Sequence, residues 1–522
     1  MPRLQKAMAL AVSFTLSLPS VVPAVGPTTP EEWYEAGKQA VKSAEKLKKP
    51  AASAKNVILF IGDGMGVSTV TAARILEGQL RGENGEENLL SFEKFPYVAL
   101  SKVYSVNQQT PDSAPTMTAM VTGVKTNDGI LAVNQYAVRG DHTTAAGNEL
   151  TTILELAEDA GKSTGVVSTA RITHATPAAC YAHTVERDWE SDANLSAAAK
   201  AANFPDIARQ LVEFSHGDGL EVALGGGRSN FLPDTTDDPE DAGRKGSRLD
   251  GRNLVNEWLG KANSAYAWNT TQFNLVDPAT TDHFLGLFER SHMEYEADRA
   301  LDTGGEPSLS DMTGKAIDIL AKNKKKGFFL MVESGRIDHA HHASNASRAL
   351  SDTIEFAKAI KTAVDKTDPK KTLIVVSADH SHVFTIAGYP KRGNPILGKV
   401  VEPDKIAPDY AKDLFNLPYT TLSYANGPGY TGTSNAQAAG PKTFPHNPTS
   451  YTTSAVRPDL TAVDTAALNY LQESTVPLGA ETHAGEDVAI YATGPNSHLF
   501  HGVMEQNVIY HVMNDALKLI KE

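Results

Sequence analysis

Acidic and imidazole side chains stand beside four short apolar runs of this 522-residue sequence. A single group of this kind is commonly a satisfied core group or a plain turn, as Gly62-Asp63-Gly64 would be on its own. Four in one chain are harder to dismiss, because a buried carboxylate without a partner is costly. We therefore expect them to hold divalent metal ions. The groups are Asp63 after 57–61, Glu333, Asp338 and His342 after 328–332, Asp379 and His380 after 373–376, and Glu481 and His483 ahead of 488–491.

The spacing between Asp338 and His342 is the most informative of these patterns. Residues four apart share one face of a helix, so this carboxylate and this imidazole can bind one ion. Glu333 precedes them by five residues, at the end of the apolar run, where it can serve a neighbouring ion. Three histidines on a solvated loop are the alternative, but a carboxylate at helical spacing favours a metal site.

Ser113 lies in the segment Pro111-Asp112-Ser113-Ala114-Pro115, at the expected start of a helix that continues to Val121. A serine there is usually a helix cap. The free N–H groups of a helix N-terminus also bind phosphate. Beside two metal ions, which stabilise an alkoxide, this hydroxyl becomes a candidate nucleophile.

The elements that must position these residues alternate along the chain. Buried apolar runs that alternate with amphipathic helices predict an α/β fold, with a large, mostly parallel sheet covered by helices on both faces. Ligands bind beyond the carboxyl ends of such strands, which is where the chemical groups stand. We expect strands at 57–61, 165–168, 222–224, 328–332, 373–376 and 488–491, and helices at 69–80, 150–159, 207–214, 312–320, 347–364 and 509–520.

Three segments fall outside this alternation. Residues 1–24 have the basic start, apolar stretch and small-residue site of a secretory signal, with a buried helix as the alternative. In residues 25–54, a capping box followed by apolar residues at helical spacing predicts a helical arm. This arm packs either on its own domain or on a second subunit. The main domain spans 55–522, and its segment from about 386 to 480 predicts an insertion with a role of its own, because its Gly-, Pro- and Asn-rich part is too long for a plain loop.

The composition excludes several classes of function. The net charge is −14 and no basic cluster is expected, which argues against a nucleic-acid platform. The single cysteine, Cys180, excludes an internal disulfide and metal sites built from several thiolates. No run after the leader reaches the ~18 apolar residues of a membrane span, and no apolar anchor tail ends the chain. We expect an exported protein, periplasmic or secreted, without a membrane anchor.

Together these motifs resemble the alkaline phosphatases, and in particular the animal branch of this metal-dependent family. The similarity runs from about Thr29 to the C-terminus and includes several separate motifs in the same order, which makes it specific. It implies a homodimer, a crown-like region at the insertion, and hydrolysis of phosphate monoesters through a covalent phosphoserine. The most specific stretches are 56–76, 111–127, 171–192, 327–342, 378–388 and 481–502.

The resemblance also implies roles for individual residues. Two Zn²⁺ and one Mg²⁺ are expected in each subunit, with Ser113 as nucleophile and Arg187 as phosphate clamp. His174 and His339 stand where some bacterial members have Asp and Lys, in the outer shell of the site. The expected ligands are Asp338, His342 and His483 for one zinc, Asp63, Asp379 and His380 for the other, and Asp63, Thr176 and Glu333 for magnesium.

A calcium site of the animal branch has similar positions in this chain, namely Glu240, the carbonyl of Phe288, Glu289 and Glu306. Glu306 replaces the usual Asp, and the acidic loop 234–241 is alternatively a solvated surface. The stretch Ser113-Ala114-Pro115-Thr116-Met117 resembles a sulfatase signature, but Met117 replaces the Arg that such a signature requires. The usual disulfides of the branch are absent.

Two competing functions follow from the same residues. A phosphodiesterase or sulfatase on the same fold would act on a diester or a sulfate ester. A non-catalytic exported carrier of metal or phosphate would need no nucleophile. Both alternatives predict outcomes that differ from monoester hydrolysis through a phosphoserine.

Overall fold

A computed structural model of the chain describes residues 34, 38–39, 42, 46–453 and 457–520. Residues from Leu47 onward belong to one compact unit, and those up to Lys46 belong to another. Four described residues of the first unit, Tyr34, Lys38, Gln39 and Lys42, are helical. The expected signal segment 1–24 lies outside the described residues, so it stays a prediction.

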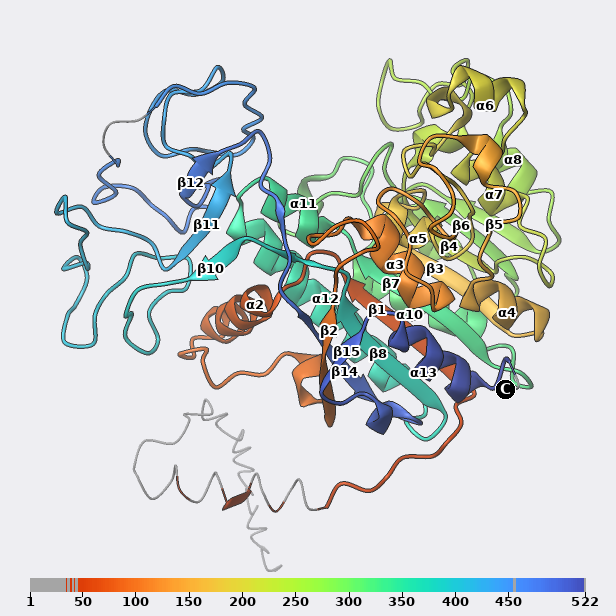
Figure 1. Ribbon diagram of the computed structural model, residues 1–522, viewed down its shortest axis with the longest axis horizontal. Helices are drawn as coiled ribbons and strands as arrows, with labels where there is room; N and C mark the ends of the chain where they lie inside the picture. Colours follow the sequence, from red (N-terminus) through yellow and green to blue (C-terminus); the bar gives the residue numbers. More distant parts are fainter. Residues whose placement is uncertain (1–33, 35–37, 40–41, 43–45, 454–456, 521–522) are drawn as a thin grey trace, which may run out of the picture. The chain divides into compact units, whose positions relative to one another are not determined.

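A ten-stranded sheet forms the centre of the large unit, in the order β15-β2-β14-β8-β1-β7-β3-β4-β6-β5 (Figure 1). All neighbours are parallel except at β14, which is antiparallel to both β2 and β8. The strands are β1 (Asn56–Gly62), β2 (Tyr97–Lys102), β3 (Ser163–Arg171), β4 (Val222–Gly226), β5 (Ser264–Ala267), β6 (His283–Leu287), β7 (Phe328–Ser334), β8 (Thr372–Ala378), β14 (Val488–Thr493) and β15 (Val503–Glu505).

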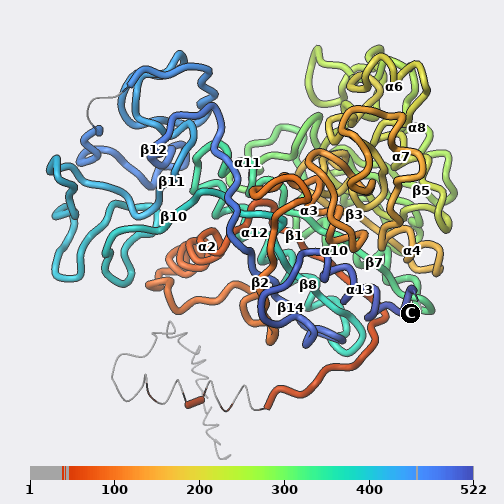
Figure 2. The backbone as a smooth tube through the Cα atoms, in the orientation of Figure 1, coloured from red at the N-terminus to blue at the C-terminus, as the bar shows by residue number. Residues whose placement is uncertain are grey.

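Helices cover both faces of this sheet, as Figure 2 also shows from the path of the backbone. They are α2 (Val67–Leu80), α3 (Ser113–Thr122), α4 (Ile153–Asp159), α5 (Ala175–Ala178), α6 (Ala197–Ala201), α7 (Ile207–Val212), α8 (Leu254–Trp258), α9 (Thr270–Leu275), α10 (Leu309–Leu320), α11 (Arg336–His342), α12 (Ala346–Lys366) and α13 (Val508–Leu517). Short 3₁₀ helices are η1 (Ser91–Lys94), η2 (His142–Thr144), η3 (Asp192–Asn194), η4 (Arg228–Phe231), η5 (Arg299–Leu301) and η6 (Ser497–Leu499).

The alternation of side chains along β1 explains why two cores form. Val57, Leu59 and Ile61 enter one apolar cluster together with α3, α4 and α13. Ile58 and Phe60 enter a second cluster, which α2, α10 and α12 complete. Successive side chains of a strand point to opposite faces, so a continuous apolar run indicates a strand that is buried on both.

The insertion carries a sheet of its own. Strands β10 (Phe384–Ile386), β11 (Leu422–Gly427) and β12 (Ser474–Pro477) form it, beside the lobe that holds the large sheet (Figure 1). A two-stranded ladder, β9 (Ser381–His382) with β13 (His483–Ala484), connects this region to the edge of the large sheet. The segment predicted as an insertion thus adds no strand to the large sheet.

The predicted fold class is confirmed, and every predicted strand and helix of the main domain has a counterpart. Strands β2, β5, β6 and β15 were not predicted, and they lie toward the two margins of the sheet. In β2 the exposed Val98 and Leu100 alternate with buried residues, so Tyr97–Lys102 lacks the continuous apolar run of a strand buried on both faces. Among the described residues, no helix has the length and apolarity needed to cross a bilayer.

Candidate metal and phosphate site

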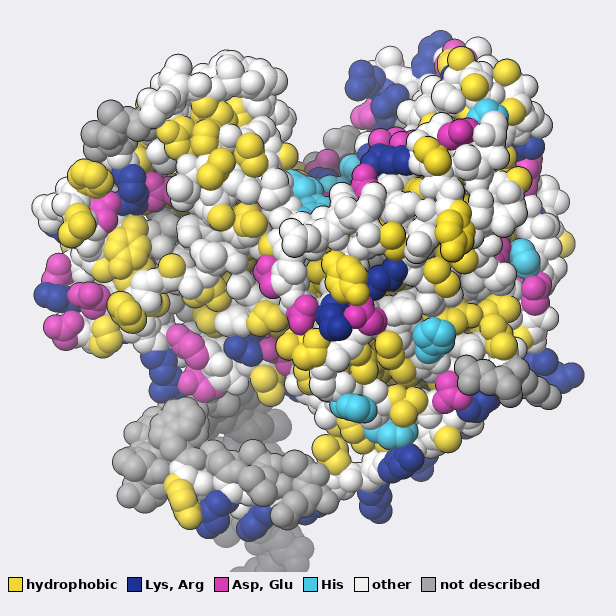
Figure 3. All heavy atoms as spheres, in the orientation of Figure 1, with side chains coloured by type: hydrophobic (Ala, Val, Ile, Leu, Met, Phe, Trp, Pro, Cys, Tyr) yellow, Lys and Arg dark blue, Asp and Glu magenta, His cyan; other side chains and the backbone are white. Residues whose placement is uncertain are grey.

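Three central strands end at one level, and this brings distant parts of the chain together. Gly62 of β1 is in register with Ser334 of β7 and with Ala378 of β8. The next residues, among them Asp63 and Asp379, therefore emerge from the same edge. Because β14 is antiparallel to β8, the segment that precedes it reaches this edge as well. Histidine and charged side chains lie in the hollow between the two lobes in Figure 3.

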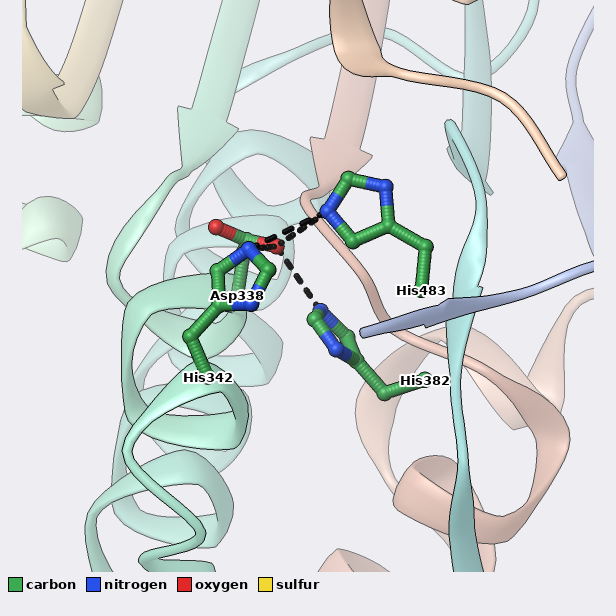
Figure 4. A group of neighbouring side chains, drawn as sticks. All are labelled: Asp338, His342, His382 and His483. Carbon is green, nitrogen blue, oxygen red and sulfur yellow. Dashed lines mark hydrogen bonds and ion pairs between the residues drawn. The ribbon is translucent and has the colours of Figure 1, made fainter. Parts of the chain in front are cut away.

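The first group of ligands surrounds Asp338 (Figure 4). Helix α11 places His342 one turn after it, and Nε2 of His342 lies 3.2 Å from Oδ1 of Asp338. Nε2 of His483 lies 3.4 Å from the same oxygen and 3.1 Å from Nε2 of His342. Asp338, His342 and His483 are the three residues that the family resemblance implies for one zinc, and they lie together here.

Backbone carbonyls fix the tautomers of both imidazoles. Nδ1 of His483 donates to the carbonyl of Pro111 at 2.8 Å, and Nδ1 of His342 donates to the carbonyl of Glu481. The lone pair of a neutral imidazole is then on Nε2, the atom that faces Asp338. An imidazole held in this way is oriented to bind a metal ion.

The second group lies beside Ser113. Nε2 of His380 is 3.4 Å from Oδ1 of Asp63 and 3.3 Å from Oδ2 of Asp379. Oγ of Ser113 lies 3.2 Å from that same nitrogen and 3.5 Å from Oδ1 of Asp63. The N–H of Gly64 donates to Asp379 at 3.0 Å, which holds this carboxylate at the end of β8.

Gly64 also shows how tightly the edge is packed. Its φ is +67°, a conformation that L side chains rarely adopt. A Cβ at this position would stand 2.3 Å from Nε2 of His382. The glycine of the Gly62-Asp63-Gly64 turn is therefore required by its conformation and by the imidazole that lies against it.

The third group shares Asp63 with the second. It places Asp63, His174 and Glu333 with their ligand atoms within 4.8 Å of one another, and all three come from different elements. The hydroxyl of Thr176 of α5 lies close enough to Glu333 to lower the pKa of that carboxyl, against the effect of burial. Ser168 of β3 donates to the second oxygen of Glu333. This is the set predicted for magnesium, with His174 added.

Buried polar atoms without partners show that these groups fit cations. Burial raises the pKa of Asp63 well above its ordinary value, and the charges of Asp379 and Asp338 raise it further. Burial likewise raises the pKa of Glu333 to about 7. Uncompensated negative charge of this kind is unfavourable in a buried site, and divalent ions would neutralise it. The buried atoms without a hydrogen-bond partner include Asp63 Oδ2, Thr176 Oγ1, Glu333 Oε1, Asp379 Oδ2 and His174 Nδ1.

Helix α3 presents Ser113 as its first residue. Asp112 precedes it in an extended conformation, and the side chain of Asp112 accepts a bond from Nη1 of Arg187. The serine is 3% exposed, and it stands at the positive end of the helix dipole. An anion at this place would meet the free N–H groups of the helix, the guanidinium of Arg187 and the metal ligands.

Arg187 and three histidines form the wall next to this position. Nη2 of Arg187 lies 3.0 Å from Nε2 of His174. The rings of His174 and His339 are 5.5 Å apart, and His292 packs on His339 at 4.1 Å. Burial lowers the pKa of all three imidazoles, and nearby arginines and histidines lower it further, which favours neutral rings. His174 and His339 thus lie beside the site, and His292 joins them unpredicted.

Comparison with known proteins identifies the family. The model of the alkaline phosphatase family matches residues 54–519. The tissue-nonspecific alkaline phosphatase of Gallus gallus is 45% identical over 493 residues, covering 93% of this chain and 88% of the relative. The chain belongs to the alkaline phosphatase family. Membership of this family makes it a phosphoric monoester hydrolase.

Other alkaline phosphatases agree with this assignment. The human tissue-nonspecific isozyme is 45% identical over 492 residues, which are 93% of this chain and 88% of the relative. The structure of the Thermus thermophilus alkaline phosphatase matches with a TM-score of 0.62 at 24% identity, over 91% of this chain and 94% of that one. The structure of the alkaline phosphatase from the Antarctic bacterium TAB5 matches with a TM-score of 0.58 at 23% sequence identity, over 90% of this chain and 100% of that one. At these identities the two structures support the fold alone.

The region predicted for calcium gathers a different set of carboxylates. Glu240 and Glu289 lie with Asp302 within 4.8 Å, and Asp302 was not predicted. Glu306 instead accepts the N–H of Glu294 at 3.0 Å. Burial raises the pKa of Glu289 to about 8 and that of Glu306 to about 9.

A guanidinium occupies part of this region. Nη2 of Arg228 is 2.7 Å from Glu240, and Nη1 donates to the carbonyl of Phe288 at 3.2 Å. A calcium ion that used these two oxygens would have to displace the arginine or share them with it.

His382, which was not predicted, lies beside the first group of candidate ligands. Nε2 of His382 lies 2.8 Å from Oδ1 of Asp338, and its Nδ1 bonds Glu481. In the ladder of β9 with β13 it is paired with His483. Its signal was present in the run Asp379-His380-Ser381-His382, where the second histidine was not assigned a role.

Proposed function

We propose that this enzyme hydrolyses phosphate monoesters through a covalent phosphoserine at Ser113. The observation that carries the proposal is the position of one hydroxyl. Oγ of Ser113 stands at the N-terminus of α3, 3.2 Å from Nε2 of His380 and 3.5 Å from Oδ1 of Asp63. A nucleophile needs this closeness to groups that bind metal, because a serine hydroxyl is weakly acidic on its own.

The residues present support two Zn²⁺ and one Mg²⁺ in each subunit. Asp338, His342 and His483 would hold one zinc, and this mixture of imidazole and carboxylate suits that ion. Asp63, Asp379 and His380 would hold the second. The oxygen-rich set of Asp63, Thr176 and Glu333 suits magnesium, with His174 beside it. When bound, such ions stabilise the attacking and leaving oxygens of an in-line displacement.

The protein groups then have distinct tasks in the reaction. Oγ of Ser113 attacks phosphorus and gives its proton to water, while the ester oxygen departs on the opposite side and takes up a proton from water to form the alcohol. Arg187 holds two phosphoryl oxygens by its planar fork, a task that Asp112 prepares by fixing the guanidinium. Water then attacks the phosphoserine, which releases inorganic phosphate and restores the hydroxyl. His174 and His339, both with lowered pKa values, line the outer side of this position.

The remaining expectations belong to the same proposal. The segment 1–24 is a signal for export, and the mature enzyme is periplasmic or secreted. It acts as a homodimer in which the arm at 25–54 and the insertion at 386–480 contribute contacts. A calcium ion binds near Glu240, Phe288, Glu289 and Glu306, with Asp302 as a further oxygen ligand supported by its position.

An acid trap tests the covalent step. The enzyme is mixed with a ³²P-labelled aryl phosphate, quenched in acid and digested, and the labelled peptide is sequenced by mass spectrometry. We expect label on Ser113 in the native chain and none in Ser113→Ala, with equal metal content in both. Label on another residue, or rapid turnover without any label in Ser113→Ala, would contradict the proposal.

The choice of substrate distinguishes related functions. Rates are compared on an aryl phosphate, a bis-aryl phosphodiester and an aryl sulfate, with the same leaving group. We expect the monoester to be hydrolysed fastest by orders of magnitude. A faster diester or sulfate ester would favour the phosphodiesterase or sulfatase alternatives, and no turnover of any of the three would favour the carrier.

A further inference from the structure

Four lysines stand side by side at the edge of the large sheet that is opposite to the metal-ligand groups. The four central strands are neighbours in the order β8-β1-β7-β3. Lys371, Lys55 and Lys162 each come directly before the first residue of a strand, and Lys326 comes two residues before β7. Since neighbouring strands lie ~4.8 Å apart, these lysines form a short row across the sheet.

Backbone contacts confirm that the row is continuous. The N–H of Lys55 donates to the carbonyl of Lys371 at 2.7 Å. Nζ of Lys162 donates to the carbonyl of Lys55 at 3.0 Å and to that of Lys326 at 2.7 Å. Burial lowers the pKa of Lys162 to about 8, and the charges of Lys326 and Lys55 lower it further.

Further lysines extend this row on both sides. Lys48 and Lys370 line one hollow of 250 Å³ at the start of β8. Lys324 and Lys325 belong to the turn that leads into β7. A hydrogen bond from the side chain of Asn323 to the carbonyl of Gly161 holds this turn beside the start of β3. Lys162 is buried beneath this row and ties Lys55 to Lys326. We call the set above it the lysine face: Lys48, Lys49, Lys55, Lys324, Lys325, Lys326, Lys370 and Lys371.

Few carboxylates neutralise the lysine face. Asp368 pairs with Lys371 at 3.2 Å. The nearby Asp515 pairs with Lys518, outside the set. Among the residues that the structure describes, no ion pair joins another member of the lysine face to a carboxylate. Folding therefore adds lysines from segments hundreds of residues apart to the run Lys324-Lys325-Lys326 and forms a basic surface.

We propose that the lysine face docks this enzyme on a lipid bilayer that is rich in anionic phospholipid headgroups. Lysine is a compact charge on a flexible stem, suited to headgroups that move laterally to meet it. The face contains no arginine, the residue that reads the phosphates and bases of nucleic acids in bidentate fashion. A bilayer therefore matches the chemistry of this face better than a nucleic acid does.

The charge of the rest of the molecule sets the orientation. The whole chain carries −14, so a negatively charged surface repels most of it. Screening limits these forces to about 8–10 Å at physiological salt, so the lysine face is attracted most strongly when it is the part nearest the membrane. The strands of the sheet lead from this face to the metal-ligand edge, and β1 alone spans ~23 Å. Docking therefore leaves the active site turned toward water.

Vesicle sedimentation of the full chain tests the proposal, with protein in the pellet as the readout. Vesicles of phosphatidylglycerol and phosphatidylcholine in equal amounts are compared with phosphatidylcholine alone. We expect binding only to the first, and its release between 50 and 300 mM salt. The variant Lys324→Gln/Lys325→Gln/Lys370→Gln should bind at least tenfold more weakly, because each lysine near such a surface contributes about fivefold.

A matched variant separates the lysine face from net charge. Lys200→Gln/Lys358→Gln/Lys412→Gln removes the same charge at exposed positions elsewhere. It should bind like the native chain, and both variants should keep the native kcat/KM on a soluble aryl phosphate. Equal weakening in both variants, binding that ignores anionic lipid, or binding of DNA in preference to vesicles would each overturn the proposal. A folded but inactive chain that still docks would refute only the proposed catalytic step.

Discussion

His382 and Asp338 are joined by a hydrogen bond of 2.8 Å, from Nε2 of the imidazole to Oδ1 of the carboxylate. The other nitrogen of His382 bonds Glu481, so both ring nitrogens face carboxylates. Although burial opposes a charge, Glu481 and then Asp338 raise the pKa of His382 to about 10. A ring that donates from both nitrogens has no lone pair for a metal ion. His382 is thus a positioning residue that orients Asp338.

Loss of this bond should loosen the first metal site. His382→Ala removes a donor from Asp338, and partners of this kind typically change metal affinity by about 10–100-fold. We expect activity to require a correspondingly higher free zinc concentration, with near-native kcat at saturation. Titration of activity in zinc buffers measures this change. His446→Gln, in the insertion, is the control, and an unchanged zinc requirement in His382→Ala would disprove the role.

Ser113→Ala should nearly abolish turnover. The substitution removes the proposed nucleophile but none of the proposed metal ligands, so kcat on an aryl phosphate should fall by about 10⁴-fold, a loss common for covalent nucleophiles. Metal content, measured by mass spectrometry, should equal that of the native enzyme. A variant that keeps a tenth of native kcat would show that another group attacks phosphorus.

Arg187→Ala should weaken inhibition by inorganic phosphate about 10–100-fold, because a charge-assisted bond to an oxyanion contributes about 1.5–3 kcal/mol. Arg187→Lys should recover only part of this loss, since an ammonium cannot form two parallel bonds. Arg139 is a suitable control, because it pairs with Glu186 next to Arg187 and is more exposed. If Arg139→Ala and Arg187→Ala weaken inhibition equally, Arg187 is not the clamp.

Removal of the metal ions should lower the melting temperature. Each ion that binds only the folded chain at a thousandfold excess over its Kd contributes about 4 kcal/mol. For a chain of this size, three such ions correspond to a shift of about 10 °C. Calorimetry of enzyme treated with a chelator, then reloaded with Zn²⁺ and Mg²⁺, measures the shift. Equal melting temperatures before and after chelation would contradict binding at the buried carboxylates.

The stability of the large unit should fall in alkaline solution because of Glu158. Burial and the nearby Glu221 raise the pKa of Glu158 to about 9, whereas it is near 4.5 in an unfolded chain. A raised pKa means that the folded state favours the proton, so this contribution is present below pH 4.5 and is lost as the pH rises toward 9.

Glu158→Gln should remove this dependence, because the amide is neutral throughout. We expect its melting temperature to fall about 2–4 °C less than that of the native chain between pH 6 and pH 9. Glu402→Gln, at a site near the surface of the insertion, should behave like the native chain. Parallel curves for Glu158→Gln and the native chain would disprove the assignment.

The local features of this protein follow from its sequence alone. Continuous apolar runs fixed the central strands, since only a strand buried on both faces has this pattern. The four-residue spacing placed Asp338 and His342 on one helix face, and motif order identified the family. Such features survive in sequence because they depend on neighbours along the chain.

The meeting of distant groups, in contrast, depends on the folded arrangement of the strands. The register of β1 with β7 and β8, and the reversed direction of β14, bring Ser113 to His380 and His382 to Asp338. The same registers place Lys55 beside Lys371 at the opposite edge. Contacts of this kind join residues hundreds of positions apart. The free energy of such a contact depends on how deeply its groups are buried and on which partners they meet, and neither can be predicted from a local sequence pattern.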